Sequence, residues 1–579
     1  MELSFQTVSR QYNEHMKKLI LLATMLLLCR VSFAQTMNFS WVKTMGDTLF
    51  DEGKQVTTDL QGNVYFTGYF KGTADFDPGS AVFNLISIDF CFFLSKLDAQ
   101  GNFIYAKQFT GITQSEGNAL QVDASGNVFL AGAFSNQTDL DPGPATYFLT
   151  AQSTDAFVCK LNASGDFVWA KQFGGAYGEF AYDIRVAATG HIYFTGEFYD
   201  LADFDPGPAT YNLSAPSAAG IYVCKLNSDG SFVWAQQVSG AGMFNRGYAL
   251  DLDQHQNIYY TGYFSGTADF DPGAGVQNLT SNGSQDIFIS KLDSAGNYVW
   301  AKRIGGTYID VAYDLVCDNS GNTYFTGTYA STVDFNPGSG VNNLISGTNS
   351  SGFVCKFDPN GNYTWAKSFF GQSASCIGWG IDIDAANNVY TTGFFYGTID
   401  FDPGSMNMPF TAQGSGPDNF INKLDGNGNY ASTLTLSGSG ATTGRCVHVA
   451  NDGSVYLTGY FSETVDFDPG TALQNVTGNT NHDIYVLKLT SSSPTATTKV
   501  LTNASLVVYP NPVFQGKLCW NSNNDVLEVA LFSLEGKKVR AVQSPKDDML
   551  DVTGIPEGTY IFQLQSSYDT YRASVQIQK

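Results

Sequence analysis

The sequence predicts an all-β fold, and three observations support this prediction. Aromatic residues make up 14% of the chain and Gly occurs 60 times, while charged residues make up only 14%, a composition typical of short strands joined by many turns. Asp, which favours turns, is far more frequent than Glu. The motif Asp-x-Asp-Pro-Gly also recurs, with one Asn variant. Its copies start, 64 to 66 residues apart, at Asp75, Asp139, Asp203, Asp269, Asp334, Asp400 and Asp466.

Each repeat predicts four strands, because segments with alternating aromatic and β-branched residues are bounded by turn residues. The motif itself lies between the second and third of these strands. Strand-like segments stand upstream of it at 63–70, 127–134, 257–264 and 322–329, and downstream of the fourth copy at 286–292 and 296–302.

Seven four-stranded units, each with a face that it cannot bury alone, predict a seven-bladed β-propeller over residues 37–490. A linear β-solenoid is the alternative. The ends of the repeat favour a closed ring, because an aromatic-x-Lys strand occurs at Trp41, before the first complete unit, while the seventh unit ends at 483–489 without a fourth strand. We therefore expect 39–45 to supply the outer strand of the last blade, which removes two open edges.

The N-terminus, residues 1–34, predicts a leader with a signal peptide. Two Lys residues precede an apolar run at 19–28, and small residues lead up to a cleavage site after Ala34. Met16 is a more natural start than residue 1. The run is short and is followed by Arg30, so we expect export without a transmembrane anchor.

After residue 490 the repeat ends. Residues 491–503 are rich in Ser and Thr and predict a linker. Residues 504–579 predict a second, smaller β domain, with strands around 526–534 and 558–562.

The second domain resembles the C-terminal (Por-type) sorting domain of type IX secretion cargo. Four motifs in order carry the resemblance: Tyr-Pro-Asn-Pro, Gly-Lys-Lys-Val, Asp-Val-Thr-Gly-Ile-Pro-Glu-Gly-Thr-Tyr and a terminal Lys. The resemblance implies an Ig-like β-sandwich, the type IX secretion machinery as partner, and a secreted or outer-surface location after Sec export and outer-membrane translocation. It assigns the sorting motif to Tyr509, Pro510, Asn511, Pro512, Gly558, Tyr560 and Lys579.

Residues 37–490 resemble bacterial secreted seven-bladed propeller-repeat proteins. The shared pattern is Gly-Asn-x-Tyr-x-Thr-Gly, then Lys-Leu, then Gly-x-x-x-Trp-Ala-Lys. Because members of that family largely lack an assigned activity, the resemblance implies a fold and export but no reaction.

Charge and motifs exclude several classes of function. The formal net charge is -23 and the pI is about 4.4, which disfavours nucleic acid and anionic membranes as partners. The sequence contains no nucleophile elbow, His-Glu-x-x-His motif, phosphate-binding Gly-Lys-Ser/Thr or dinucleotide fingerprint. We therefore expect a protein without enzymatic activity.

The repeated motif supplies paired carboxylates beside a Gly turn, an arrangement that calcium uses. The third acidic ligand and the distal Glu of a calcium loop do not follow, so we expect Asx turns in which Asp accepts backbone N–H groups. No cofactor is expected, and calcium is the alternative. Its candidate ligands are Asp75, Asp77, Asp139, Asp141, Asp203, Asp205, Asp269, Asp271, Asp334, Asp400, Asp402, Asp466 and Asp468.

Three Cys residues, Cys159, Cys224 and Cys355, occupy one repeat position on different blades. We do not expect equivalent positions on different blades to lie within disulfide distance, and the Cys spacings match no zinc pattern. We expect buried free thiols.

The repeats differ most just before their first strand, where unlike residues are free to specify a ligand at the rim of the central channel. Drift at an unconstrained surface is the alternative interpretation. The candidate rim residues are Glu52, Glu116, Glu179, Arg246, Asp310 and Trp379.

Together these patterns predict a monomeric, secreted or surface-attached propeller that binds an unknown glycan or protein, or mediates adhesion. The alternatives are a polysaccharide lyase or glycosidase with its site in the channel, or a structural surface protein. A deep channel with clustered acids of raised pKa would favour the enzyme, and a flat or plugged one would favour binding.

Overall fold

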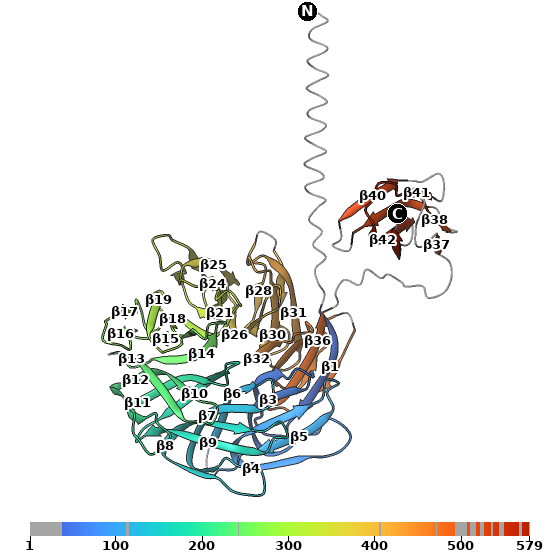
Figure 1. Ribbon diagram of the computed structural model, residues 1–579. Coiled ribbons are helices and arrows are strands. Elements are labelled where there is room, and N and C mark those ends of the chain that lie inside the picture. Colours follow the sequence, from blue (N-terminus) through green and yellow to red (C-terminus); the bar gives the residue numbers. More distant parts are fainter. Residues whose placement is uncertain are drawn as a thin grey trace, which may run out of the picture. The chain divides into compact units, whose positions relative to one another are not determined.

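The computed structural model describes residues 37–111, 115–240, 242–404, 407–470, 472–491, 507–509, 517–521, 526–533, 537–543, 549–566 and 570–577, in which every regular element is a β-strand. The chain divides into a large unit, Thr36–Ser491, and a second unit that contains Ser492–Lys579 (Figure 1). The leader, with its cleavage site at Ala34, and residues 492–503 of the predicted linker lie outside the described residues.

Seven groups of four antiparallel strands, here called blades, follow one another in the large unit, and hairpin pairings join some of them into larger sheets. In the first three blades the second and third strands extend into the hairpin that carries the repeated motif. Blade 1 contains β2 (Glu52–Thr58), β3 (Val64–Asp75), β4 (Asn84–Leu97) and β5 (Phe103–Gln108); blade 2 contains β6 (Ser115–Val122), β7 (Val128–Asp139), β8 (Phe148–Leu161) and β9 (Phe167–Gly175); blade 3 contains β10 (Glu179–Val186), β11 (Ile192–Asp203), β12 (Asn212–Leu226) and β13 (Phe232–Gly240).

In the other four blades that hairpin is a separate pair of short strands. Blade 4 contains β14 (Arg246–Leu252), β15 (Ile258–Phe264), β18 (Asp286–Leu292) and β19 (Tyr298–Ile304); blade 5 β20 (Val311–Cys317), β21 (Thr323–Tyr329), β24 (Ser351–Phe357) and β25 (Tyr363–Phe369); blade 6 β26 (Ser375–Ile383), β27 (Val389–Tyr396), β30 (Asp418–Leu424) and β31 (Tyr430–Gly438); blade 7 β32 (Thr442–Val449), β33 (Val455–Phe461), β36 (Asp483–Ser491) and β1 (Met37–Met45). The hairpins are β16 (Thr267–Asp269) with β17 (Asn278–Thr280), β22 (Thr332–Asp334) with β23 (Asn343–Ile345), β28 (Thr398–Asp400) with β29 (Pro409–Thr411), and β34 (Thr464–Asp466) with β35 (Asn475–Thr477).

The blades close into a ring. The first strand of each blade contacts the first strands of both neighbouring blades, and β2 of blade 1 contacts β32 of blade 7. Strand β1 pairs antiparallel with β36, from Met37 opposite Ser491 to Met45 opposite Ile484, and so forms the outer strand of blade 7. In Figure 1 the colours run around the ring, and blue β1 lies beside orange β36. The fold is therefore a seven-bladed β-propeller, not a linear solenoid.

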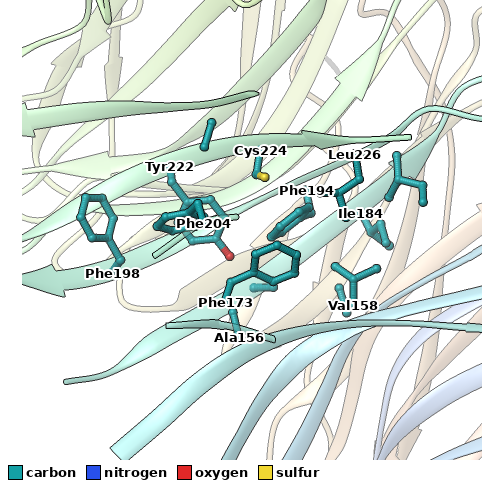
Figure 2. Close-up of a cluster of buried hydrophobic side chains, with 14 of the residues drawn as sticks. Ala156, Val158, Phe173, Ile184, Phe194, Phe198, Phe204, Tyr222, Cys224 and Leu226 are labelled. Carbon is teal, nitrogen blue, oxygen red and sulfur yellow. The ribbon is translucent and has the colours of Figure 1, made fainter. Parts of the chain in front are cut away.

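Large apolar side chains fill the space between neighbouring blades. Figure 2 shows one such cluster, in which Phe173 of blade 2 packs against Phe194 of blade 3 with ring centres 4.8 Å apart. Phe204, the central residue of a repeated motif, lies in the same cluster and is fully buried, as are its equivalents Phe76, Leu140, Phe270, Phe335, Phe401 and Phe467. Each motif thus inserts one side chain into the core.

The repeated motif also joins neighbouring blades. Asp203 pairs with Gly174, at the end of the outer strand of the preceding blade, and Asp269 pairs with Ser239 in the same way. Because these pairings cross from one blade to the next, they extend the sheets at the periphery and cover strand edges that would otherwise be open.

The second unit contains two antiparallel sheets. One consists of β37 (Val507–Tyr509), β38 (Lys517–Asn521) and β41 (Met549–Asp551), and the other of β40 (Lys538–Gln543), β39 (Val526–Phe532), β42 (Gly558–Ser566) and β43 (Thr570–Ile577). Leu518 and Leu550 of the first sheet share one buried cluster with Val529, Leu531 and Leu564 of the second. The unit therefore has a core between two sheets, and its Ig-like character stays a prediction.

Candidate functional site

Every inner strand of the propeller carries a β-bulge at the same position. In β2 the register shifts between Gly53 and Gln55, and the six other inner strands shift at the equivalent place. A bulge redirects the extra side chain and occurs often beside functional sites. The bulge residues, which we call the bulge ring, are Lys54, Asn118, Tyr182, Tyr248, Tyr313, Trp379 and Arg445.

A small residue precedes each bulge because the neighbouring blade comes close. A Cβ atom on Gly53 would lie 2.2 Å from Oγ1 of Thr458 in blade 7, and one on Gly247 would lie 2.6 Å from Oγ1 of Thr195 in blade 3. Each inner strand can therefore lie close against the second strand of the preceding blade at this level of the channel, which brings the following bulge side chains together.

Four successive members of the bulge ring are aromatic, and each contacts the next. The ring centres of Tyr182 and Tyr248 are 5.4 Å apart, those of Tyr248 and Tyr313 are 5.1 Å apart, and those of Tyr313 and Trp379 are 4.1 Å apart. The guanidinium of Arg445 continues the series 4.4 Å from the centre of Trp379. Since these side chains come from five consecutive blades, they surround the end of the channel at which the inner strands begin.

Ion pairs accompany the aromatic side chains. Arg246 donates two hydrogen bonds to Glu197, of 2.9 and 2.7 Å, and lies over the rings of Tyr182 and Tyr248. Such a two-point pair fixes the guanidinium. We call the bulge ring, together with Glu52, Glu116, Glu197 and Arg246, the mouth.

Glu52 neutralises two cations of the mouth. Its carboxylate pairs with Arg445 and, at 3.2 Å, with Lys54. Burial of Glu52 opposes ionisation, but the charges of Lys54 and Arg445 outweigh it and hold the pKa at about 2. The carboxylate is therefore charged at neutral pH.

The loops around the mouth expose large apolar side chains. These loops join the outer strand of one blade to the inner strand of the next. Exposed fractions reach 69% at Met243 and 59% at Tyr308. Exposed groups of this kind mark interaction surfaces when they gather on one face. The rim-loop residues are Leu49, Phe50, Tyr177, Met243, Phe244, Tyr308 and Ile309.

At its opposite end the channel holds a cavity of about 490 Å³, which we call the chamber. Its lining comes from all seven inner strands, on the C-terminal side of the bulges. Arg185 lines it and pairs with Asp183 at 2.6 Å and with Asp251, on the next inner strand, at 3.3 Å. His448 lies 3.3 Å from Asp382.

The chamber carboxylates tie neighbouring inner strands together. Asp183 accepts a 3.0 Å hydrogen bond from the backbone of Leu250, one blade further on, and Asp251, Asp314 and Asp382 accept equivalent bonds from Cys317, Ile381 and Val449. Burial raises the pKa of Asp314 to about 8, with the nearby Asp183 charge as a smaller cause, and burial also raises the pKa values of Asp183 and Asp251.

Four of the six rim residues singled out in the sequence lie at the mouth. Trp379 belongs to the bulge ring, Glu52 and Arg246 begin inner strands, and Glu116 occupies the position equivalent to Glu52, close enough to Tyr69 to help raise its pKa. The structure brings these four to one end of the channel.

The other two, Glu179 and Asp310, are fully buried between blades. Glu179 accepts a 2.9 Å bond from the backbone N–H of Gly175, and Asp310 accepts bonds from the backbone N–H groups of Gly306 and Ala330. Both carboxylates therefore serve the junction between blades, and the structure does not bring them to the channel mouth.

The motif carboxylates form the expected Asx turns. Asp75 Oδ1 accepts backbone N–H bonds from Asp77, at 3.0 Å, and Phe83, at 2.9 Å, while Asp77 Oδ1 accepts one from Gly79 at 2.8 Å. In the variant copy, the amide oxygen of Asn336 takes the same role. Among the described residues, no group of three or more His, Cys, Asp or Glu side chains is arranged to hold a metal ion. Calcium at these turns stays the alternative interpretation.

The described cysteines of the propeller are free thiols. Cys159, Cys224 and Cys355 are fully buried, and burial raises the pKa of each thiol. They act as small apolar core residues.

Residues 507–578 match the family model described as the secretion system C-terminal sorting domain. The chain carries a sorting domain. The protein is therefore a secreted or outer-surface protein, exported by the type IX secretion machinery. Helices long and apolar enough to cross a membrane do not occur within the described residues.

Within the sorting domain, Tyr509 ends β37, while Gly558 and Tyr560 lie in β42. The hydroxyl of Tyr560 donates a 3.0 Å hydrogen bond to the carbonyl of Pro556. The remaining residues of the motif, Pro510, Asn511, Pro512 and Lys579, lie outside the described residues.

Comparisons with the whole chain also find repeat proteins. An uncharacterized WD repeat-containing protein of Acanthamoeba polyphaga mimivirus is 23% identical over 508 residues, which cover 73% of this chain and 36% of that protein. The chain thus spans about a third of that relative's length. Two solved structures are the Pan2 WD40 domain of Neurospora crassa, at 10% identity and a TM-score of 0.38 (75% of this chain, 88% of that one), and Sqt1 from Chaetomium thermophilum, at 9% and 0.38 (79% and 100%). The propeller assignment rests on the strand pairing and the closed ring.

Sequence reasoning missed most of the bulge ring, Glu197 and the charged residues of the chamber. The available signal was positional: in all seven copies the variable residue directly follows a small one, Gly or Ala. Comparing the copies residue by residue at that position would have identified the bulge ring.

Proposed function

We propose that the secreted propeller binds a ligand at its mouth and that the sorting domain serves its export. The bulge ring carries this proposal. Seven equivalent bulges aim side chains at one end of the channel, and there the chain places four touching aromatic rings and an arginine instead of a repeated scaffold residue. Tyr, Trp and Arg are the side chains that dominate binding energy in recognition sites.

The two ends of the channel differ in a way that supports this assignment. At the chamber end, the turns between the first and second strands repeat one polar design, as when Asp123 accepts backbone bonds from Ser125 and Asn127, and Asp318 accepts them from Ser320 and Asn322. At the mouth, by contrast, the loops differ from blade to blade and expose apolar side chains. Variable loops on a rigid scaffold are where proteins place binding residues.

A glycan and protein array tests the proposal. The full chain is compared with a Tyr248→Ala/Trp379→Ala variant and with Phe148→Ala, a control that removes an exposed ring from the edge of blade 2. The proposal predicts that hits of the wild type persist in the control and vanish in the double variant. Binding that survives in the double variant would contradict a ligand site at the mouth.

Enzymatic activity in the chamber is the second candidate function. The clustered carboxylates of the chamber and the raised pKa of Asp314 are the features that favour a lyase or glycosidase, with His448 nearby. Against this, each of the four carboxylates is engaged by backbone N–H groups, a structural use. Release of reducing ends from a polysaccharide panel, abolished by Asp382→Asn, would establish the enzyme.

A further inference from the structure

We infer that the ligand of the mouth is an uncharged polysaccharide. This inference rests on the proposed function and adds the chemical class of the ligand. It follows from the charge balance of the mouth, from the kinds of side chain there, and from the extent of the rim loops.

The mouth has no net formal charge, although the chain carries -23. Its three cations are Lys54, Arg246 and Arg445, and its three carboxylates are Glu52, Glu116 and Glu197. Arg246 is held by Glu197, and Glu52 holds both Lys54 and Arg445. Because the charges compensate one another, a ligand gains little from being charged, and the acidic protein as a whole repels polyanions.

The side chains of the mouth match the two surfaces of a sugar. A pyranose ring presents apolar C–H groups that pack on aromatic faces, and hydroxyls that both donate and accept hydrogen bonds. The mouth offers rings at Tyr248, Tyr313 and Trp379, and guanidinium donors at Arg246 and Arg445. The half-buried Glu116 carboxylate is an acceptor there, whereas Glu52 and Glu197 are buried in their ion pairs. Amphipathic rings beside polar groups provide this combination at low entropy cost.

The rim loops extend the same chemistry beyond one sugar unit. Phe50, Tyr177, Phe244 and Tyr308 lie in loops at four different blade junctions and are between 46% and 59% exposed. Rings presented from several sides of the mouth suit a chain that crosses it better than a single saccharide that fills it. We therefore expect a polymer.

Affinity electrophoresis suits this test, because a chain of pI about 4.4 migrates readily in a native gel. The full chain runs through gels containing neutral polysaccharides (galactomannan, xyloglucan or laminarin), anionic ones (alginate or polygalacturonate), or none. We expect retardation by at least one neutral polymer and none by the anionic ones. The double variant Tyr177→Ala/Tyr308→Ala should weaken the apparent affinity for that polymer about tenfold, because two exposed rings are lost without disturbing the core. Phe148→Ala should leave it unchanged.

A second readout separates the chemistry from the site. Titration calorimetry with the retained polymer should give the same affinity at low and high salt, since screening affects only charged ligands. Retardation by anionic polymers alone would overturn the uncharged polysaccharide as ligand while leaving a mouth site in place. The same conclusion would follow if all array hits were proteins and Trp379→Ala abolished their binding. Retardation that neither the Tyr177/Tyr308 pair nor Tyr248→Ala/Trp379→Ala weakens would overturn both.

Discussion

The guanidinium of Arg445 lies 4.4 Å from the centre of the Trp379 ring, across the boundary between blades 6 and 7. The same guanidinium pairs with Glu52 of blade 1, so one side chain joins three blades. The two contacts differ in strength. The contact with the Trp379 ring is a weak cation–π interaction, whereas the contact with the buried Glu52 carboxylate is an ion pair.

Replacing Arg445 with Gln should therefore destabilise the ring as well as alter the mouth. Glu52 would keep only Lys54 as a cation, so its pKa should rise from about 2. We expect the free energy of unfolding to fall by about 2 kcal/mol, because a buried carboxylate loses one of its two cationic partners. Urea unfolding measures this loss. The double variant Glu52→Gln/Arg445→Gln should recover part of the loss, and equal stability of Arg445→Gln and wild type would contradict the coupling.

Closure of the ring by β1 predicts a loss of cooperativity when that strand is absent. Deleting 37–45 would leave β36 with an open edge and remove Met45 from the core that also contains Ile484 and Val486. We expect a broad transition, or separate ones, in calorimetry of the truncated protein, because open ends allow blades to unfold singly. An undisturbed single transition would show that β1 is dispensable.

Stability should depend on pH through the carboxyl groups between blades. Burial, with the neighbouring Asp155 charge as a smaller cause, raises the pKa of Glu179 from 4.5 to about 8. The folded state therefore holds this proton more tightly than the unfolded state. The contribution of Glu179 to stability is therefore fully present below pH 4.5, where both states are protonated, and is lost as the pH rises toward 8. Glu179→Gln should raise the melting temperature at pH 8 by about 2 °C or more and change it little at pH 4. An equal effect at both pH values would contradict this assignment.

The Asx turns predict a difference between two substitutions at one position. Asn336 already serves in one copy with a bond of 2.9 Å to Gly338, so Asp205→Asn should be nearly neutral. Asp205→Ala should lower the free energy of unfolding by about 1 kcal/mol, because the N–H of Gly207 loses its acceptor.

If the Asx turns serve only to hold the backbone, added calcium should release no heat and leave the melting temperature unchanged. A calcium-dependent rise would restore calcium as a ligand.

The repeated parts of this fold were predictable from sequence, and the variable parts only partly so. Seven copies of the motif predict the blades, and the isolated Trp41 segment identifies the strand that pairs with β36. The Asp surplus likewise follows from the Asx turns. Each of these features is local or recurs at a fixed period, so a single chain reveals it.

The mouth was harder to predict because a bulge breaks the two-residue period of a strand. The side chain of Tyr248 therefore takes a direction that simple alternation does not give. A difference of one residue also decides which side chains at the start of an inner strand reach the mouth. Asp310 lies one position before Val311, the first residue of β20, and is buried. Arg246 is the first residue of β14 and reaches the mouth. Such differences depend on the three-dimensional register between blades.

Hydrogen exchange of the full chain, with and without the ligand that the array identifies, tests the central claim most directly. We expect slower exchange at the start of the inner strands, around Tyr248, Tyr313 and Trp379, and in the rim loop at 305–309, with no change in the chamber turns at 253–257. Protection confined to the chamber turns and to residues around Arg185 would contradict it and would place the ligand at the other end of the channel.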